Sequence, residues 1–506
     1  MSSELPSPAP GVVYLVGAGP GDPRLVTVRG LRLIEQADVI LYDNLAAPGL
    51  LTHGRPNAET VYVGKKRAKH AKTQEEINSL LIGYARAGKK VVRLKGGDPF
   101  IFGRGGEEAE ALAVAGVRFE VVPGVTSAVG VAAYTGIPLT DRRFTSEVTL
   151  VTGHEPEQID WHRLGRQGTL AIFMGLTNFG DIARRLMEAG RAPSTAAAAV
   201  RWGTRGDQVS LDGTLENLAD KINEEDLKPP ALILVGEVVA LRQRINWFER
   251  LPLFGQTIVV TRAREQAAAL AEPLRELGAN VLELPTIEIR PPDDWAALDQ
   301  AIREIDQYDW LIFTSANGVR YFTARLDEAA KDLRDLKARI CAIGPATEAS
   351  VRALHLKVDL MPEEYVAESV LAAFAKADLE GKRILLPRAM KARDVIPVEL
   401  GRRGARVDVV AAYQTVIPAS SAQRAAEMFE GERKPDWITF TSSSTVTHFA
   451  GLFPLDKLRG VRVASIGPVT SATARELGIE IHAEPREYTV AGLVDAIVAA
   501  QAKVAV

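Results

Sequence analysis

Cysteine and histidine are scarce in this chain of 506 residues, which contains one cysteine, Cys341, and seven histidines. A single cysteine excludes an intramolecular disulfide, a cysteine zinc site and an iron–sulfur cluster, and it indicates no oxidising compartment. His154 has no second histidine or cysteine at ligand spacing, so the sequence predicts no metal site.

An excess of charge and a long membrane-type apolar run are also missing. The net charge is −3 at pH 7, which argues against a general polyanion binder, so we expect no nucleic-acid partner. The longest uncharged run, 121–140, is interrupted repeatedly by proline and glycine, and predicts a buried loop, helix and turn rather than a membrane span. The opening MSSELPSPAPG lacks the basic and apolar regions of a signal peptide, so we expect a cytoplasmic protein.

Short apolar runs rich in β-branched residues alternate with helical patterns from end to end, as in VVYLVG, LRLIEQAD and VILYD. This alternation predicts an α/β fold with mostly parallel sheets. The rhythm lapses between residues 241 and 256, and the chain is about three times as long as one typical domain. We therefore expect a disordered tail at 1–11, a first domain at 12–245, a linker at 246–255 and a second domain at 256–506.

The second domain contains an internal repeat. GQTIVVTRAREQ at 255 returns as GKRILLPRAMKA at 381, and DWLIFTSANGVRYF at 309 returns as DWITFTSSSTVTHF at 436. Two similar α/β units of roughly 125 residues follow, with a cleft between them that suits a small ligand. The simplest interpretation of the repeat is two consecutive lobes.

Three glycine-rich turns follow predicted strands in the first domain: VGAGPGDP at 16, RLKGGDPFIFGRGG at 93 and VPGVTSA at 122. They can meet at the carboxyl edge of one parallel sheet. A dinucleotide loop fits poorly, because Pro20 and Pro23 remove amide donors that would hold a pyrophosphate. Asp43, after the second predicted strand, keeps the nucleotide interpretation open.

The three motifs in this order resemble the uroporphyrinogen-III C-methyltransferase family, from about Val12 to Leu241. The resemblance implies a two-lobed α/β domain, a homodimer, and S-adenosylmethionine as cofactor with S-adenosylhomocysteine as its product. That cofactor carries no phosphate, so its site needs close backbone approach, which glycine permits. By resemblance, the residues lining the cofactor are Pro20, Gly96, Gly97, Asp98, Ile101, Thr126, Ser127, Met174, Gly203, Ala231 and Leu232.

The resemblance also implies an acid–base pair, with Asp43 as proton acceptor and Lys65 as proton donor. A helix-capping aspartate and a solvated lysine are the alternative interpretations. The family's tetrapyrrole substrate has eight carboxylates, and the cationic candidates to bind them are Lys66, Arg67, Arg104 and Arg142. A run of charges such as 65–72 is equally typical of a solvated face.

Hydroxyl residues recur at predicted helix starts in the second domain. This half resembles uroporphyrinogen-III synthase over about Phe254 to Ala499, through the motifs FTSANGV, AIGPAT, VVAAYQTV, FTSSSTV and SIGPVTSATA. Helix amino ends attract carboxylates, although ordinary N-capping explains any one such residue. The resemblance implies a bilobal α/β domain without a cofactor, in which the chain crosses between lobes near 284–290 and 412–418. It gives Tyr413 a role in departure of a hydroxyl, with a packed aromatic as the alternative. The substrate-binding residues that it implies are Thr314, Ser315, Thr347, Arg388, Lys391, Ser442, Ser443 and Thr470.

We therefore expect a bifunctional enzyme. Its second half cyclises hydroxymethylbilane to uroporphyrinogen III with inversion of ring D, and its first half methylates that product at C2 and C7 to precorrin-2, for sirohaem or cobalamin. Two alternatives stay open: a tetrapyrrole methylase acting at other ring positions, and a second half that only binds or regulates.

Overall fold

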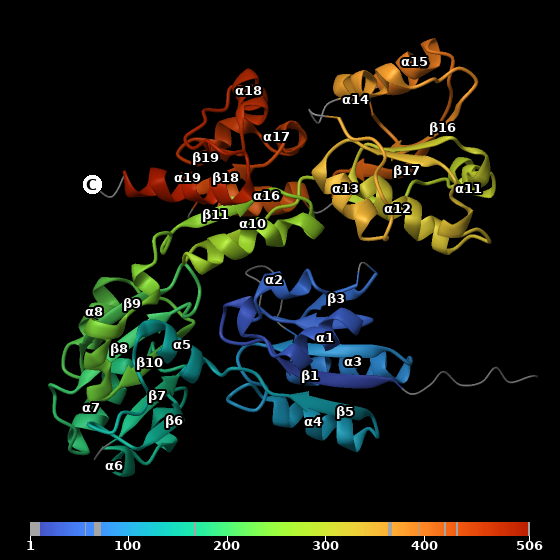
Figure 1. Ribbon diagram of the computed structural model, residues 1–506. Helices are drawn as coiled ribbons and strands as arrows, with labels where there is room; N and C mark the ends of the chain where they lie inside the picture. Colours follow the sequence, from blue (N-terminus) through green and yellow to red (C-terminus); the bar gives the residue numbers. More distant parts are fainter. Residues whose placement is uncertain are drawn as a thin grey trace, which may run out of the picture.

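The computed structural model describes residues 11–55, 57–64, 72–165, 168–362, 367–392, 394–418, 421–431 and 434–503. These residues form an α/β protein with two sheets in each half of the chain (Figure 1). Among them, no helix combines the length and the apolar character needed to cross a membrane.

The first sheet is parallel throughout, in the order β3-β2-β4-β1-β5. Alternate strand residues enter two separate cores, with Val13 and Leu15 on one face and Val16 on the other. Helices therefore cover both faces, as buried apolar strands of a parallel sheet require. The elements are β1 (Val12–Gly17), β2 (Val39–Tyr42), β3 (Glu59–Tyr62), β4 (Lys90–Lys95) and β5 (Arg118–Val122), with η1 (Pro23–Leu25), α1 (Val28–Gln36), α2 (Pro48–Leu51), α3 (Gln74–Arg86) and α4 (Gly105–Val114).

The uncharged run 121–140 forms the end of β5, a loop, helix α5 (Ser127–Thr135) and a turn, which confirms the predicted loop, helix and turn; the helix buries one face, whereas the loop is partly exposed. Helix α5 ends at Gly136, whose φ of +70° is the left-handed conformation that glycine adopts without strain.

The second sheet is mixed, in the order β6-β7-β10-β8-β9. Only the β6–β7 pair is parallel, so the prediction of mostly parallel sheets is wrong here. The connection from β8 to β9 is too short for a crossover helix, and such a link joins antiparallel neighbours. The elements are β6 (Val148–Thr152), β7 (Thr169–Phe173), β8 (Ala196–Arg201), β9 (Val209–Thr214) and β10 (Ala231–Val235), with η2 (Pro156–Gln158), α6 (Trp161–Leu164), α7 (Phe179–Glu188) and α8 (Leu218–Glu224).

The segment between the halves is folded against helix α5. It contains η3 (Glu237–Leu241), α9 (Arg242–Ile245) and η4 (Phe248–Arg250). The Tyr134 ring contacts Trp247 and Phe248, at centroid distances of 5.2 and 4.7 Å, and Phe248 contacts Phe254 at 5.4 Å. Arg242 pairs with Glu249 at 2.6 Å, so this segment is held in one conformation rather than left as an extended spacer.

The first lobe of the second half is a parallel sheet in the order β12-β11-β18-β19. Two cores cover its faces, one with α10 and α19 and one with α16, α17 and α18. The elements are β11 (Thr257–Val260), β12 (Asn280–Glu283), β18 (Trp437–Phe440) and β19 (Arg462–Ser465), with α10 (Arg264–Glu276), α16 (Ser421–Phe429), α17 (Ser443–Leu452), η8 (Leu455–Leu458), α18 (Pro468–Glu476) and α19 (Val490–Ala502).

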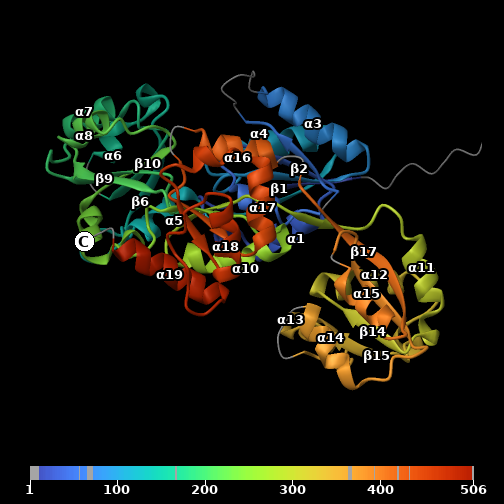
Figure 2. The ribbon, with the colours of Figure 1, turned by 90° about the horizontal axis from the view of Figure 1, so that it is seen from above.

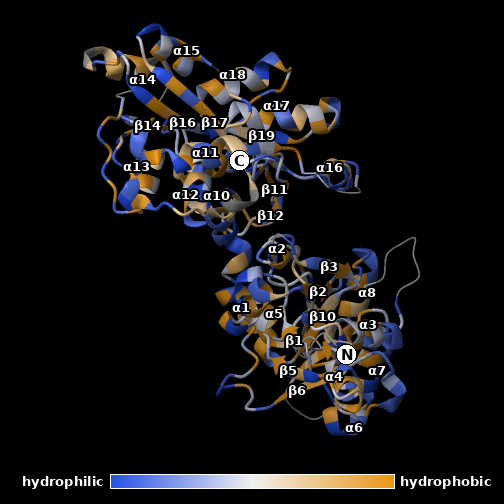
Figure 3. Ribbon diagram, turned by 90° about the vertical axis from the view of Figure 1, so that its right-hand side faces the viewer, coloured by the Kyte–Doolittle hydropathy of each residue, from blue (hydrophilic) through white to orange (hydrophobic). Residues whose placement is uncertain are grey.

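The second lobe has the order β13-β17-β16-β14-β15, parallel except for the β13–β17 pair. Its strands are mostly hydrophobic, whereas its helices carry residues of both kinds (Figure 3). The elements are β13 (Glu288–Arg290), β14 (Trp310–Phe313), β15 (Arg339–Ala342), β16 (Arg383–Ala389) and β17 (Arg406–Val416), with α11 (Ala296–Arg303), η5 (Ile305–Gln307), α12 (Ala316–Asp327), η6 (Leu333–Asp335), α13 (Pro345–Arg352), α14 (Ala367–Ala373), η7 (Phe374–Lys376) and α15 (Val395–Arg402).

The two lobes are not consecutive in the chain. The first lobe combines strands β11 and β12 with β18 and β19, and the second lobe is built from the intervening β13 to β17. The chain thus crosses between lobes twice, after β12 and after β17, which confirms the crossings that the family resemblance implies. The interpretation of the repeat as two consecutive lobes is wrong. Figures 1 and 2 show the lobes side by side, with the first lobe over the first half of the chain.

Candidate functional site

The three glycine-rich turns of the first half meet at the carboxyl edge of its parallel sheet. The Gly97 amide donates to the Gly19 carbonyl at 2.7 Å, and the Gly19 amide donates back at 3.2 Å. The third turn joins them through Gly124, whose amide donates to Asp98 Oδ2 at 3.0 Å. A Cβ at Gly124 would lie 2.3 Å from the Gly97 carbonyl oxygen, so these turns can touch only as bare backbone.

A cavity of about 1300 Å³ opens over these turns. It is larger than the roughly 300–1,000 Å³ typical of a site for one small ligand. All eleven residues predicted to line the cofactor lie on its wall, and so do Asp43 and Arg104. The structure therefore brings together residues that the sequence spreads from Pro20 to Leu232.

The remaining cationic candidates of the first half are placed differently. Arg142 is exposed and lies outside the residues that line the cavity. Arg104 lies on the wall, where its guanidinium pairs with Glu107 at 2.6 Å. Lys65, Lys66 and Arg67 fall outside the described residues, so their predicted roles stay predictions.

Asp43 is fixed by two contacts at the end of strand β2. Its Oδ1 accepts from the Leu45 amide at 3.0 Å, and its Oδ2 accepts from Arg93 Nη2 at 3.0 Å. The side chain is 24% exposed, so one oriented carboxylate both holds the turn and faces the cavity.

A buried charge cluster behind Asp43 escaped the sequence analysis. Arg93 Nε and Lys95 Nζ both donate to Glu108 Oε1, at 3.2 and 2.9 Å, and Glu108 is fully buried. Within the described part of the chain, Glu108 Oε2 has no hydrogen-bond partner. Burial lowers the pKa of the Lys95 ammonium, and neighbouring Arg93 lowers it further. The signal was present in the strand VVRLKG, where two basic residues at i and i+2 share one face.

Asp22 is a second functional candidate that the sequence analysis missed, in the turn GAGPGD. Its carboxylate accepts from Arg24, with Oδ2 2.7 Å from Nη2, and from the Tyr134 hydroxyl at 2.9 Å. Burial alone would raise the pKa of this carboxyl, but the bonds from Arg24 and Tyr134 outweigh it and hold the pKa below its ordinary value. The Asp22 amide donates to Thr204 Oγ1 at 2.9 Å, which ties the first turn to the loop after β8.

Comparisons with known proteins agree with this geometry. Residues 12–219 match the model of the tetrapyrrole (corrin/porphyrin) methylases, and residues 268–495 match that of uroporphyrinogen-III synthase HemD. The porphyrin biosynthesis protein HemD of Ruminiclostridium josui is 38% identical over 476 residues, covering 93% of this chain and 94% of that protein. This chain belongs to the same family as the Ruminiclostridium josui protein. It contains a tetrapyrrole methylase region followed by a uroporphyrinogen-III synthase region.

Other relatives of this family align with part of the chain. The uroporphyrinogen-III C-methyltransferase of Bacillus subtilis (strain 168) is 40% identical over 338 residues, covering 66% of this chain and 69% of that protein. A crystal structure of uroporphyrin-III C-methyl transferase from Thermus thermophilus, complexed with S-adenyl homocysteine, is 42% identical, with a TM-score of 0.40. It covers 46% of this chain and 100% of that one.

The candidate residues of the synthase region fall into two groups, and the second lobe carries one of them. Tyr413 is 8% exposed, and its hydroxyl lies 3.0 Å from Ser315 Oγ. Its ring stacks on Tyr321, at a centroid distance of 5.9 Å. Tyr413 is thus packed within its own lobe, with its hydroxyl at the start of helix α12. Thr314, next to this serine, is partly buried, Thr347 is 3% exposed, Arg388 pairs with Asp394, and Lys391 is exposed.

The first lobe carries Ser442, Ser443 and Thr470. Ser442 caps helix α17 by accepting from the Thr445 amide at 3.3 Å, as Ser315 caps α12 by accepting from Gly318. Ser443 Oγ accepts from Thr473 at 2.9 Å, and Thr470 is 5% exposed. By contrast, α13 and α18 begin with Gly-Pro, and no described side chain caps them. Ordinary capping therefore explains two of the four predicted helix starts, and the other two keep uncapped amides.

Proposed function

We propose that the methylase region transfers methyl groups from S-adenosylmethionine to C2 and C7 of uroporphyrinogen III, giving precorrin-2. The synthase region makes that uroporphyrinogen III from hydroxymethylbilane, with inversion of ring D. The observation that carries the proposal is the cavity over the three joined turns, which has every residue assigned to the cofactor by resemblance on its wall.

The donor set suits S-adenosylmethionine. Backbone packs directly on backbone where Gly97 meets Gly19 and Gly124, and Gly97 lines the cavity, which leaves room for close approach by a ligand without phosphate. Asp98 is held rigidly, because its two oxygens accept from the Phe100 and Gly124 amides at 2.8 and 3.0 Å. When bound, this cofactor supplies an electrophilic methyl group on a sulfonium.

The protein's own task in methyl transfer is to position the donor and the acceptor and to manage one proton. The joined turns fix one reactant, and alignment of the reacting atoms supplies most of the acceleration in a displacement of this kind. Methylation of a pyrrole carbon then requires loss of a proton. Asp43 is an oriented carboxylate on the cavity wall, and we assign it as the acceptor, with Arg93 as the residue that positions it. Lys65 is proposed as the donor on the resemblance alone.

In the synthase region, the chain has to fold an acidic linear substrate into one geometry while its hydroxyl leaves as water. The uncapped amides at the starts of α13 and α18 can receive acetate and propionate groups, helped by the helix dipole. The Tyr413 hydroxyl is assigned to assist departure of the hydroxyl, and Ser315 orients it.

We also propose a homodimer formed through the methylase region, domains at 12–245 and 256–506, and a cytoplasmic location. Light scattering of the purified chain at several concentrations tests the dimer: a constant mass of one chain contradicts it.

The decisive experiment supplies the purified full chain with hydroxymethylbilane, with and without S-adenosylmethionine. Without the cofactor we expect the type-III isomer, and with it a product heavier by two methyl groups, whose positions carbon-13 NMR assigns to C2 and C7. The spontaneously closed type-I isomer contradicts the synthase assignment. Methylation elsewhere on the ring contradicts the assignment of positions.

A further inference from the structure

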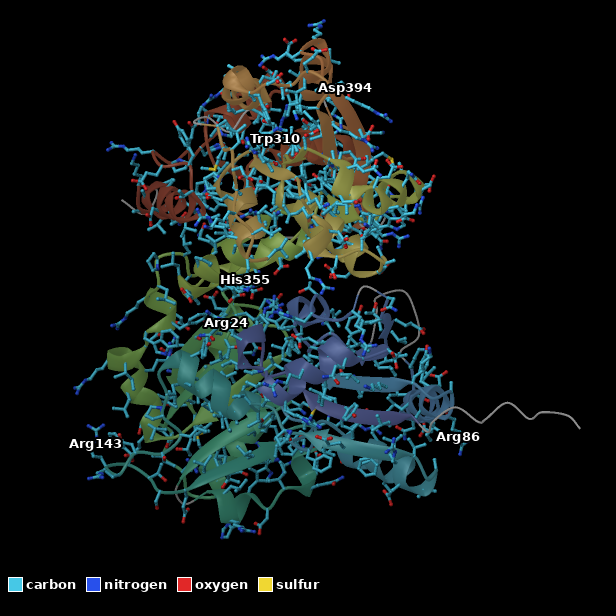
Figure 4. All side chains as sticks on the ribbon, turned by 45° about the vertical axis from the view of Figure 1, so that its right-hand side comes forward. Arg24, Arg86, Arg143, Trp310, His355 and Asp394 are labelled. Atoms are coloured by element: carbon cyan, nitrogen blue, oxygen red, sulfur yellow. The ribbon has the colours of Figure 1, made fainter. Side chains whose placement is uncertain are left out.

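The cavity over the glycine-rich turns is lined by both halves of the chain. Besides residues of the methylase region, its wall includes 279–283 of the synthase region, which are strand β12 and the residue before it, and one face of helix α16, with Arg424, Glu427 and Met428. Arg24 lies where the first half faces the second (Figure 4). The first lobe of the synthase region thus closes part of the methylase cavity.

This closure is a tight fit at Gly206, which belongs to the loop after β8. The Gly255 amide donates to the Gly206 carbonyl at 2.9 Å. A Cβ at Gly206 would lie 2.1 Å from the Asn280 amide nitrogen and 2.5 Å from the Gly278 carbonyl oxygen. Thr204 in the same loop is bonded to the Asp22 amide, so the loop connects the first glycine-rich turn directly to the synthase region.

The wall contributed by the synthase region has its own charges. Arg275 is 13% exposed and is held between Glu272 and Glu283, at 2.7 and 2.8 Å, so it braces the wall. Arg424 Nη2 donates to the Glu283 carbonyl at 2.5 Å, which fixes the guanidinium beside the cavity. Glu427 follows one helical turn later, and its Oε1 accepts from Gln423 at 2.9 Å.

We propose that this wall binds the tetrapyrrole acceptor of the methylase region, with Arg424 contacting one of its carboxylates and Glu427 weakening the binding by repulsion. The inference rests on the proposed function. Every residue assigned to the cofactor by resemblance lies between Pro20 and Leu232, so the synthase wall is available to the acceptor, together with Asp43 and Arg104 of the methylase region on the same cavity. Residues of both halves then form the acceptor site, so the synthase lobe sets the affinity of the methylase region for its tetrapyrrole substrate.

The test measures methylation of uroporphyrinogen III by full-length Arg424→Gln, Glu427→Gln and a matched control, Arg475→Gln, which lies on α18 of the same lobe outside the cavity lining. We expect Arg424→Gln to raise KM for uroporphyrinogen III about three- to tenfold, as for loss of one partly exposed charge-assisted contact. Glu427→Gln should lower that KM about two- to threefold by removing a repulsion of similar kind. KM for S-adenosylmethionine and the type-III product of the synthase should stay unchanged in all three proteins.

Opposite changes in KM for the two α16 variants support the proposal, because loss of a merely structural contact would not improve affinity. An unchanged KM in both α16 variants, or an equal change in the Arg475 control, overturns it. If Arg424→Gln loses synthase activity and so its fold, Glu427→Gln alone decides, by lowering KM or not. A wild-type chain that does not methylate uroporphyrinogen III overturns the proposed function instead, so the two failures are distinguishable.

Discussion

Replacing Gly124 by alanine tests whether joined backbone forms the cofactor site. The new Cβ would lie 2.3 Å from the Gly97 carbonyl oxygen and 2.7 Å from Gly17 Cα, whereas real Cβ contacts stay beyond 3.0 Å. All of these neighbours are backbone, so no side-chain rotation relieves the clash and the turns have to separate.

The cost of such overpacking is about 1–3 kcal/mol. If bound S-adenosylhomocysteine needs the closed turns, the ligand has to restore them, and its Kd should rise about 5- to 150-fold. Isothermal titration calorimetry on the full chain measures this. The matched control is Gly83→Ala in helix α3, where a Cβ meets nothing within 4 Å. The control should keep the wild-type Kd and gain about 0.5–1 kcal/mol of stability from better helix propensity. A Gly124→Ala protein that binds with the wild-type Kd and melts at the wild-type temperature would refute the reasoning.

Four further outcomes are expected. Glu108→Gln leaves the buried Lys95 without its counter-charge and leaves Arg93 paired with Asp43 alone, and it should cost about 3–5 kcal/mol in denaturant unfolding; a loss below about 1 kcal/mol contradicts a stabilising cluster. The carboxyl of Asp22 has a lowered pKa in the folded state. Its contribution to the free energy of unfolding is therefore complete above 3.8, the pKa of this carboxyl in the unfolded chain, and disappears as pH falls through its pKa in the folded chain. Wild type should therefore exceed Asp22→Asn in stability at neutral pH and lose that advantage in acid, and a difference independent of pH argues against the ion pair. Tyr413→Phe removes one hydrogen bond, worth about 1 kcal/mol of unfolding free energy, and should lower the yield of type-III isomer, whereas unchanged yield contradicts the proposed role. Residues 286–418 expressed alone should unfold cooperatively, because they supply every strand of the second lobe, and a non-cooperative melt contradicts this.

Local patterns were sufficient for much of the methylase region. The turns at Gly19, Gly97 and Gly124 are short-range features, and their order in sequence predicted a common edge that the structure confirms. The second, mixed sheet was not predicted, because the direction of a strand depends on the length of its connection and on its neighbours. Glu108 lies in a helix whose acidic residues resemble a solvated surface in the sequence, and tertiary packing alone brings it under the strand with Arg93 and Lys95.

Which strands pair in the synthase region was decided by tertiary structure. In both lobes an aspartate just before one strand accepts a hydrogen bond from a backbone amide of the neighbouring strand: Asp436 from Thr257, and Asp309 from Arg383. Because both lobes have this contact, it does not decide which repeat each strand pairs with. The two repeats therefore offer nearly equivalent local signals.

The sequence by itself determined the class of fold, the repeat and the turns, because each depends on residues close together along the chain. The grouping of β11 and β12 with β18 and β19 in one lobe depends on contacts between residues that are about 180 positions apart in the chain. Thr261 Oγ1 donates to the Thr439 carbonyl at 2.7 Å, and Thr439 Oγ1 donates to the Val259 carbonyl at 3.0 Å. In the other repeat, Pro387 stands at the position of Thr261 and Ile312 at that of Thr439, and neither side chain has a hydroxyl group. Buried hydroxyls need hydrogen-bond partners, and pairing β11 with β18 gives both threonine hydroxyls an acceptor. Long-range packing likewise brings both halves of the chain to the wall of one cavity.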